Sequence, residues 1–269
     1  MPLPEDLLAI AVEIAREAGE LARRRRTEGV AVAATKSALA DIVTEADREV
    51  EALIRARLAE LRPGDGFLGE ESGATVQLGE GEGTGITWVV DPIDGTVNYA
   101  YGIPSYAVSI AAVTGEPRPG VWEALAGVVF NPASGELFHA VHGGGAWLDG
   151  ERLAVNAQPS SAGALLATGF GYDPATHAGD LARVARVMPL ARDLRRIGAA
   201  SLDFAFVAAG RLDGYFEPGL QPWDHAAGAL LVTEAGGLVH IGDEDRAVIV
   251  ATGPGLFAAL LAAAIESDS

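Results

Sequence analysis

Asp91-Pro92-Ile93-Asp94-Gly95-Thr96 follows the apolar run 86–90, and the rest of the architecture can be worked out from this junction. A short apolar run of this kind predicts a buried strand. Two carboxylates, those of Asp91 and Asp94, stand where we expect this strand to end. Pro92 disfavours helical geometry at the preceding residue and fixes its own φ. We therefore predict a sharp turn that brings both acids to the same side.

The chemistry that suits this junction is a magnesium site with a phosphate lying across it. Mg²⁺ prefers carboxylate oxygens and usually keeps substrate phosphate oxygens among its ligands. Gly95 lacks a Cβ, so the backbone can approach a ligand closely. A helix that begins near Gly95 and Thr96 would point its N–H groups and its dipole at the phosphate. The alternative is an Asp-Pro turn with an aspartate N-cap, a common structure in turns rich in Asp, Pro and Gly.

Other acids along the chain favour the metal interpretation. Glu70 and Glu71 are adjacent and follow an apolar pair, so a buried position would require cations, although a solvated acidic loop is the alternative. Asp224 precedes an apolar run and is typical of a helix N-cap, a role that does not exclude metal binding. Asp47 completes Thr44-Glu45-Ala46-Asp47, which resembles a capping box with Asp in place of Glu.

Composition limits the functions that this chain can have. Its 269 residues, of which 49% are hydrophobic, suffice for one large domain or two lobes. A net charge of −18 argues against a nucleic-acid partner bound by broad electrostatics, and it would repel phosphorylated substrates unless cations fill the acidic cleft. Without cysteine the chain forms no disulfide, which favours a reducing compartment. No apolar run approaches about 18 residues, so we expect a cytoplasmic protein with no membrane partner.

The order of elements predicts a layered α/β protein. Apolar residues at helical spacing indicate helices over 3–26 and 44–61, and strands are expected near Phe67 and Trp88. Four antiparallel strands follow between residues 106 and 148. Strands and helices then alternate to the C-terminus. Gly143-Gly144-Gly145 lies between two strands, so we predict a tight hairpin and not a phosphate loop. The histidines have no metal-like spacing, and we expect them to be structural or exposed.

Several of these blocks together resemble the inositol monophosphatase family in both order and spacing. They lie between positions 36 and 228, and the flanking helices fit as well. The matching blocks are Lys36-Ser37, Asp41 to Asp47, Gly69-Glu70-Glu71-Ser72, Asp91 to Thr96, Arg196-Ile197-Gly198, Gly210 to Glu217 and Trp223 to Gly228. The resemblance implies a five-layer αβαβα sandwich with two mixed sheets. It also implies one two-lobed domain over 1–269, with an N-terminal α+β lobe (1–150), a C-terminal α/β lobe (151–269) and metals where the lobes meet.

The resemblance implies two to three Mg²⁺ ions in each active site. Glu70, Asp91 and the Ile93 carbonyl would hold the first ion. Asp91, Asp94 and Asp224 would hold the second, and a third, looser ion would bind Glu70 and waters. Glu71 would lie beside the first metal. Lys36 and Asp41 would belong to a loop that closes toward the metals.

Catalytic and substrate residues are carried over in the same way. Glu70, Thr96 and Asp47 would be catalytic, with Thr96 and Asp47 orienting the attacking water. Gly95 and Thr96 would present N–H groups to the phosphate. The residues expected around the alcohol part of the substrate are Asp94, Gly198, Ala199, Ala200 and Glu217. Ala199 departs from the small hydroxyl residue that we expect there, which leaves the preference for a particular sugar open.

The resemblance implies the hydrolysis of a small phosphate monoester, with inositol 1-phosphate as the favoured substrate, by a lithium-sensitive, homodimeric enzyme. No covalent intermediate is expected, because the chain has no cysteine and no evident Ser–His arrangement. Histidinol phosphate, fructose 1,6-bisphosphate, 3′-phosphoadenosine 5′-phosphate and NADP are the alternative substrates, since fold does not fix substrate. A binding or regulatory protein on the same fold is the alternative from another class.

Overall fold

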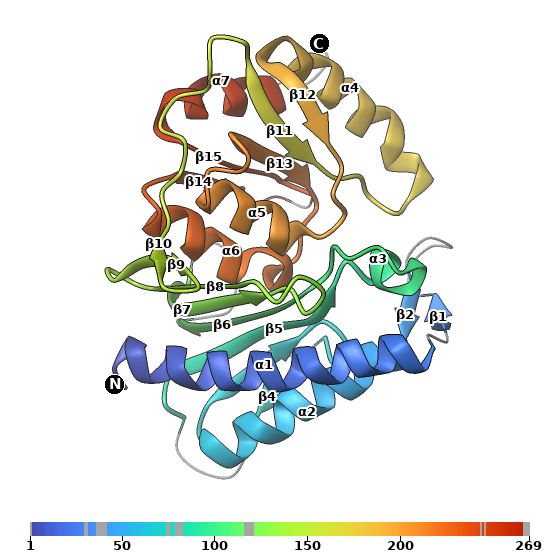
Figure 1. Cartoon of the computed structure of the whole chain (residues 1–269), viewed down its shortest axis with the longest axis vertical. Helices are drawn as coiled ribbons and strands as arrows, with labels where there is room; N and C mark the ends of the chain where they lie inside the picture. Colours follow the sequence, from blue (N-terminus) through green and yellow to red (C-terminus); the bar gives the residue numbers. More distant parts are fainter. Residues whose placement is uncertain are drawn as a thin grey trace.

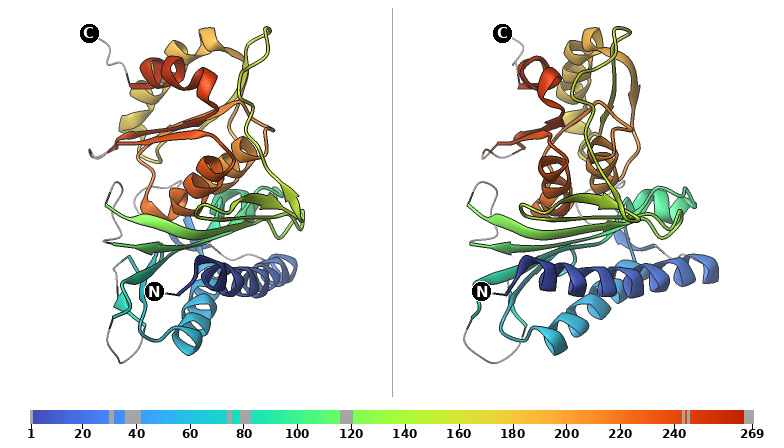
Figure 2. Two further views of the ribbon diagram at one scale, coloured as in Figure 1. Left: turned by 90° about the vertical axis from the view of Figure 1, so that its left-hand side faces the viewer. Right: turned by 60° about the vertical axis from the view of Figure 1, so that its left-hand side comes forward.

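Five layers, in which helices alternate with sheets, stack along the long axis of the molecule (Figures 1 and 2). The computed structural model describes residues 2–29, 32–35, 42–73, 76–78, 83–115, 121–242, 244 and 246–265, and of 32–35, 42, 43 and 76 it describes the backbone. Within these ranges no helix is long and apolar enough to cross a bilayer. The predicted αβαβα sandwich with two mixed sheets is confirmed.

The first layer consists of α1 (Pro4–Glu28) and α2 (Glu45–Leu61), which cover one face of the larger sheet (Figure 1). The inward face of α1 carries small and branched apolar residues such as Leu7, Ala11 and Ile14, all fully buried. Helix α2 begins at the predicted capping box, in which the Thr44 side chain and the Asp47 carboxylate each accept a backbone N–H of the other residue. Asp47 is thereby fixed on the first turn of α2.

The larger sheet has eight strands in the order β10-β9-β8-β7-β6-β5-β3-β4. Strands β3 and β5 are parallel, and the other neighbours are antiparallel. Its strands are β3 (Gly66–Gly69), β4 (Val76–Gln77), β5 (Ile86–Asp94), β6 (Ala107–Thr114), β7 (Glu123–Phe130), β8 (Leu137–Val141), β9 (Gly145–Leu148) and β10 (Glu151–Arg152). A two-stranded ribbon, β1 (Val32–Thr35) and β2 (Ile42–Thr44), and the short helix α3 (Thr96–Tyr101) lie at one end.

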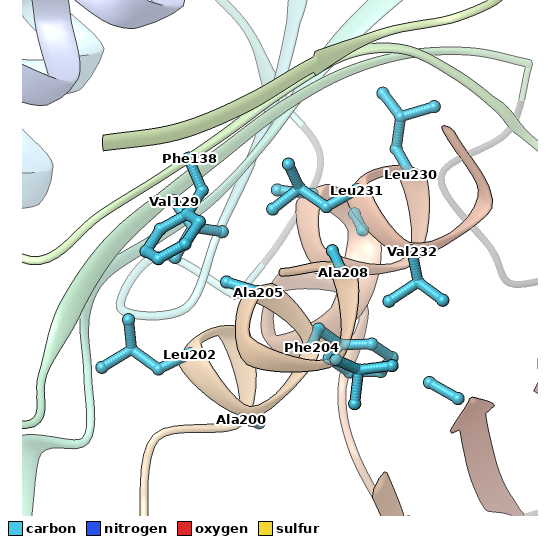
Figure 3. Packing of buried hydrophobic residues seen from close by; sticks show 14 of the residues in the cluster. Val129, Phe138, Ala200, Leu202, Phe204, Ala205, Ala208, Leu230, Leu231 and Val232 are labelled. Carbon is cyan, nitrogen blue, oxygen red and sulfur yellow. The ribbon is translucent and has the colours of Figure 1, made fainter. Parts of the chain in front are cut away.

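The middle layer is formed by α5 (Ala200–Ala208) and α6 (Pro222–Glu234), which pack between the two sheets. Every residue of α5 except Phe206 is buried, including the polar Ser201 and Asp203. Figure 3 shows Leu202 and Phe204 of α5 with Leu231 of α6 in one cluster with Val129 and Phe138 of the larger sheet. Side chains from both sheets and both helices thus form a single core.

The smaller sheet has the order β12-β11-β13-β15-β14 and is covered on its outer face by α4 (His177–Val187) and α7 (Pro254–Ile265) (Figure 1). Its strands are β11 (Ala164–Thr168), β12 (Ala191–Arg195), β13 (Gly214–Pro218), β14 (Leu238–Ile241) and β15 (Val248–Thr252). Strand β11 is parallel to β12 and to β13, and the remaining pairs are antiparallel. Two 3₁₀ turns, η1 (Pro174–Thr176) and η2 (Met188–Leu190), flank α4.

Two local predictions need correction. Strand β5 does not end at Val90 but continues to Asp94, and the turn comes at Gly95 with a left-handed φ of 85°. Asp224 is not the N-cap of α6: Gln221 is, and the Asp224 carboxylate accepts the Gln221 N–H at 2.7 Å. The glycine hairpin is confirmed between β8 and β9, where the N–H groups of Gly143 and Gly145 donate to Glu234.

Candidate active site

A pocket of about 440 Å³ opens where β3 and β5 of the larger sheet meet the loops that follow β11 and β13 of the smaller one. It lies at the carboxyl ends of parallel strands, the usual place for a ligand in an α/β sheet. Of the predicted site residues, those that line it are Glu70, Asp91, Ile93, Asp94, Gly95, Thr96, Gly198, Ala199, Ala200, Glu217 and Asp224.

A bulge in β5 places two of the acids together. Asp91 pairs with Ser109 and Asp94 with Ala107, so three steps on β5 face two on β6. In a regular strand, residues three apart point to opposite faces, and the extra residue of a bulge reverses this. The backbone N–H of Ile93 donates to the Asp91 carboxylate at 3.1 Å and stabilises the bulge. The same-side placement predicted for Asp91 and Asp94 is thus present, although a bulge produces it and not a turn.

The other acids come from neighbouring elements. Glu70 follows β3 directly, and its N–H donates to the carbonyl of Val90 in β5 at 3.1 Å, so the turn stays beside the bulge. Asp224 enters from the first turn of α6. Gly127 of β7 lies against Ala227 in that helix, where an added Cβ would be 3.0 Å from the Ala227 Cα. This close approach lets α6 bring Asp224 down to the larger sheet.

The carboxylates raise one another's pKa. Burial, and then the charges of Glu70, Asp94 and Asp224, raise the pKa of Asp91 well above its ordinary value. Burial is also the largest cause for Asp224 and for Asp94, whose pKa is raised to about 6. Strongly perturbed acids in a cleft mark functional sites more often than structural ones. A divalent cation would relieve this repulsion, so the donor chemistry fits Mg²⁺.

The acids line one pocket, but their side chains are not arranged as metal ligands. Across the residues that the structure describes, no three His, Asp or Glu side chains are already arranged so that they could hold a metal ion. Asp91 instead shares a hydrogen bond with Glu70. The assignment of individual ligands to individual ions therefore stays a prediction, supported by the pocket that the acids line together.

Thr96 and Asp47 form the predicted pair. The Thr96 hydroxyl lies 3.2 Å from Asp47 Oδ1 and 3.1 Å from the Ile93 carbonyl, so its single proton can be donated to either oxygen. Asp47 is fully buried, and its second oxygen accepts the N–H of Thr44 at 2.8 Å as well as the Thr44 hydroxyl. Burial raises the pKa of Asp47 to about 6 despite these donors. The carboxylate is therefore mostly ionised at neutral pH yet basic enough to accept a proton.

The opposite wall of the pocket belongs to the smaller sheet. Glu217 on β13 accepts the Tyr215 hydroxyl at 2.5 Å, and its carboxylate occupies the space that a side chain on Gly169 would need. Burial raises the pKa of Glu217 to about 7, and the nearby Arg196 partly opposes this. This wall can therefore donate or accept a hydrogen bond toward a hydroxyl of the substrate.

Arg246 stands at the edge of that wall. Its guanidinium donates a hydrogen bond to the buried Asp180 at 3.3 Å. Asp180 also accepts hydrogen bonds from the Gly171 N–H, the Thr176 hydroxyl and the Arg183 guanidinium, each at 3.2 Å. Gly171 and Arg246 both line the pocket. Asp180 thus fixes the 170–173 loop in place.

Of the remaining predicted residues, Glu71 stands apart from the pocket. Glu71 borders a separate surface hollow beside Arg48, and its N–H donates to Glu51 at 2.8 Å. Lys36 and Asp41, expected on a closing loop, lie outside the described residues. Their predicted roles remain expectations from the resemblance.

Three residues that shape the site were not predicted from the sequence. Glu51 of α2 is buried under the 70–72 turn, and its position four residues after Asp47, on the same helical face, was the available signal. Ser201 lies in the first turn of α5 and donates its hydroxyl to Asp94, a long-range contact that no local pattern in the sequence signals. Arg246 gives no signal either, because only the fold brings its loop to the pocket.

Fold and pocket together define a class of layered α/β protein, in which two mixed sheets and three helical layers surround an acid-lined pocket. The model of the inositol monophosphatase family matches residues 3–267, and the chain therefore belongs to this family.

Known relatives agree with that assignment. The inositol-1-monophosphatase of Mycobacterium leprae (strain TN) is 44% identical over 276 residues, covering 97% of this chain and 94% of the relative. The Nus factor SuhB of Escherichia coli (strain K12) is 41% identical over 235 residues, covering 87% and 84%. The crystal structure of the extragenic suppressor protein suhB from Bartonella henselae superposes with a TM-score of 0.86 at 35% identity, covering 98% of this chain and 100% of that one.

Proposed function

We propose that this enzyme hydrolyses small phosphate monoesters with the help of Mg²⁺ and that inositol 1-phosphate is its principal substrate. The observation that carries the proposal is the meeting of Glu70, Asp91, Asp94 and Asp224 in one pocket beside the start of α3. A relative named inositol-1-monophosphatase, aligned over nearly the whole chain, supports the choice of substrate.

In this proposal the carboxylates would hold two to three Mg²⁺ ions. Glu70, Asp91 and the Ile93 carbonyl would hold one ion, and Asp91, Asp94 and Asp224 would hold the next. Glu70 would also contribute to a third, more weakly bound ion. When bound, such ions supply Lewis-acid stabilisation of the phosphate and leaving-group charges and lower the pKa of water.

The chain's own residues orient the reactants. Gly95, with its left-handed φ, and Thr96 present N–H groups to the phosphate at the start of α3. Asp47 accepts, through the Thr96 hydroxyl, the proton that the attacking water loses. Positioning and electrostatics carry most of the catalysis in phosphoryl transfer, where roughly 20 kcal/mol of barrier lowering is required.

The alcohol half of the substrate lies against Asp94, Gly198, Ala199, Ala200 and Glu217. Ala199 is 1% exposed and offers no hydroxyl, so recognition at this point rests on backbone groups and on Glu217. Histidinol phosphate, fructose 1,6-bisphosphate, 3′-phosphoadenosine 5′-phosphate and NADP are the competing substrates.

Phosphate release from this panel at millimolar Mg²⁺ tests the proposal. We expect the highest kcat/KM for inositol 1-phosphate, loss of turnover on chelation, and inhibition by Li⁺. The Thr96→Val variant keeps the shape of the side chain without its hydroxyl and serves as the matched control for a contaminating phosphatase. Absence of release from every member of the panel would contradict a phosphatase.

A regulatory or binding role is the second candidate, and the relatives named Nus factor SuhB are the observation that favours it. These names also bear on our expectation of no nucleic-acid partner, which rests on the net charge of −18. The two candidates separate in a strain that lacks the gene. If folded Asp94→Asn protein without turnover restores every phenotype, the regulatory role is the essential one.

We further propose a homodimer in the cytoplasm. Light scattering during gel filtration tests the first statement, since a dimer has twice the chain mass of 27.7 kDa. Fractionation of cells followed by immunodetection tests the second.

A further inference from the structure

The start of α5 binds the side chain of Asp94, which lies at the end of β5 in the larger sheet. The backbone N–H of Ala200 donates to Asp94 Oδ1 at 3.1 Å, and the N–H of Ser201 donates to Oδ2 at 2.7 Å. The Ser201 hydroxyl also donates to Oδ2. Ser201 is fully buried and Asp94 is 7% exposed, so bulk water does not compete for these bonds.

A count of lone pairs shows what these donors leave free. A carboxylate has about four acceptor positions, two on each oxygen. The two donors from Ser201 fill Oδ2, and the single donor from Ala200 leaves one position on Oδ1. Asp94 lines the pocket. Oδ2 therefore fixes the orientation of the carboxylate, and only Oδ1 is left for a cation.

Of the three hydrogen bonds to Asp94, only that of the Ser201 hydroxyl comes from a side chain. The hydroxyl expected at position 199 is replaced by Ala199, which caps α5 without any side-chain hydrogen bond. Two residues further on, Ser201 directs its hydroxyl at the acid and not at the alcohol of a substrate.

We propose that Ser201 is a positioning residue that fixes Asp94 as a single-oxygen ligand for the cation of the active site. The proposal rests on the proposed function for the presence of that cation. Partners that orient metal ligands typically change metal affinity by about 10- to 100-fold when they are removed.

A purely structural role for Ser201 predicts something different. Loss of one buried hydroxyl would then lower the stability of the protein and leave its cation affinity unchanged. Thr252 provides the matched control, because it is fully buried in the same half of the chain and donates its hydroxyl to the Asp213 carbonyl at 2.5 Å, outside the pocket.

The experiment is a calorimetric titration of the substrate-free, full-length protein with Mg²⁺, with Mn²⁺ as a second probe. We expect Ser201→Ala to weaken cation binding by about 10-fold or more. Ser201→Thr, which keeps the hydroxyl, restores affinity to near that of the wild type, and Thr252→Val leaves it unchanged. In phosphate release, the Mg²⁺ concentration for half-maximal rate rises by the same factor in Ser201→Ala, while kcat at saturating Mg²⁺ recovers.

Equal cation affinity in Ser201→Ala and the wild type overturns the proposal. If Ser201→Ala does not fold, the pair Ser201→Thr and Ser201→Val decides, because these differ only in the hydroxyl, and equal affinity again overturns it. A wild type that binds Mg²⁺ but releases no phosphate from the panel refutes the proposed function alone. A working phosphatase with unchanged affinity in the variants refutes the positioning role alone.

Discussion

Two buried aspartates lie at opposite ends of the parallel pair β3 and β5, and their surroundings differ. Asp65, before β3, is fully buried and accepts hydrogen bonds from Trp88 Nε1 at 2.9 Å, the Thr84 hydroxyl at 2.5 Å and the Arg62 guanidinium at 2.8 and 3.0 Å. Asp91, near the end of β5, is 2% exposed and has carboxylates around it. The chain supplies a counter-charge for the first acid and like charges for the second.

This contrast separates a structural acid from a functional one. A buried charge is tolerated when it is paired and hydrogen-bonded, and the Asp65 cluster meets both conditions. The acids around Asp91 repel one another, which destabilises the fold unless cations bind. Burial alone does not mark a site, whereas burial among like charges does.

The largest expected effect comes from replacing an acid of the pocket. Asp94→Asn keeps the shape of the side chain but removes a charge that a metal requires. We expect kcat/KM for phosphate release to fall roughly a thousandfold, as the loss of several kcal/mol of metal stabilisation implies. In chelator the relief of repulsion is offset by the loss of an acceptor for one of the two α5 N–H groups that Asp94 binds, so we expect a denaturant midpoint close to that of the wild type. Near-normal turnover would end the distinction drawn between the two aspartates.

Replacing the structural acid gives the converse result. Asp65→Ala leaves Arg62 and the Trp88 N–H without their partner, which costs about 3 kcal/mol of unfolding free energy. Denaturant titration measures this loss. Turnover per folded molecule stays close to that of the wild type, since Asp65 does not line the pocket. A drop in turnover larger than the drop in folded protein would contradict the structural role.

His225 extends the comparison to a buried base: it follows Asp224 in α6, and burial accounts for the shift of its pKa. Among the residues that the structure describes, neither ring nitrogen has a hydrogen-bond partner, and burial lowers the pKa of His225 to about 4. Between pH 6.5 and 4 the unfolded chain therefore binds a proton that the folded protein does not. The unfolding free energy falls through this range as pH decreases, by up to about 3 kcal/mol from this group.

The control for His225 is His225→Phe, which fills a similar volume without polar atoms. We expect it to be more stable than the wild type by about 1 kcal/mol at pH 7 and by more at pH 5. Chemical denaturation at several pH values in the presence of chelator measures the difference. A constant difference across pH would show that His225 titrates normally in the folded protein.

The smallest effect belongs to exposed charges. Arg57 of α2 pairs with Glu13 and Glu17 of α1 at 2.7 and 3.1 Å, but these carboxylates are largely exposed. Exposed pairs contribute little, so Arg57→Ala shifts Tm by no more than about 3 °C. Differential scanning calorimetry at low and high salt measures the shift, and a shift as large as that of Asp65→Ala would contradict the ranking.

Most of the architecture could be predicted from local signals. Hydrophobic periodicity and caps located α1 and α2 within about two residues, because these helices bury one face and end at clear boundaries. The resemblance supplied the order of the layers, which no local pattern contains. The acids of the pocket were predicted because each lies near the end of a strand or the start of a helix.

Long-range geometry could not be read from the sequence in the same way. The bulge between Asp91 and Asp94 depends on the register against β6. The two-residue strands β4 and β10 form only through pairing with a neighbour. The contact of Ser201 with Asp94 joins positions 107 residues apart, and the chain has no local feature that records it.

The shared middle layer also determines how this protein could be divided. Helices α5 and α6 come after residue 150, yet they cover the inner face of a sheet that comes almost entirely before it. A cut after residue 150 would leave one fragment with a bare apolar sheet and the other with apolar helices facing water. We expect each fragment to aggregate when made alone and the two to reassemble when made together. Recovered phosphatase activity would then report that the two fragments have reassembled.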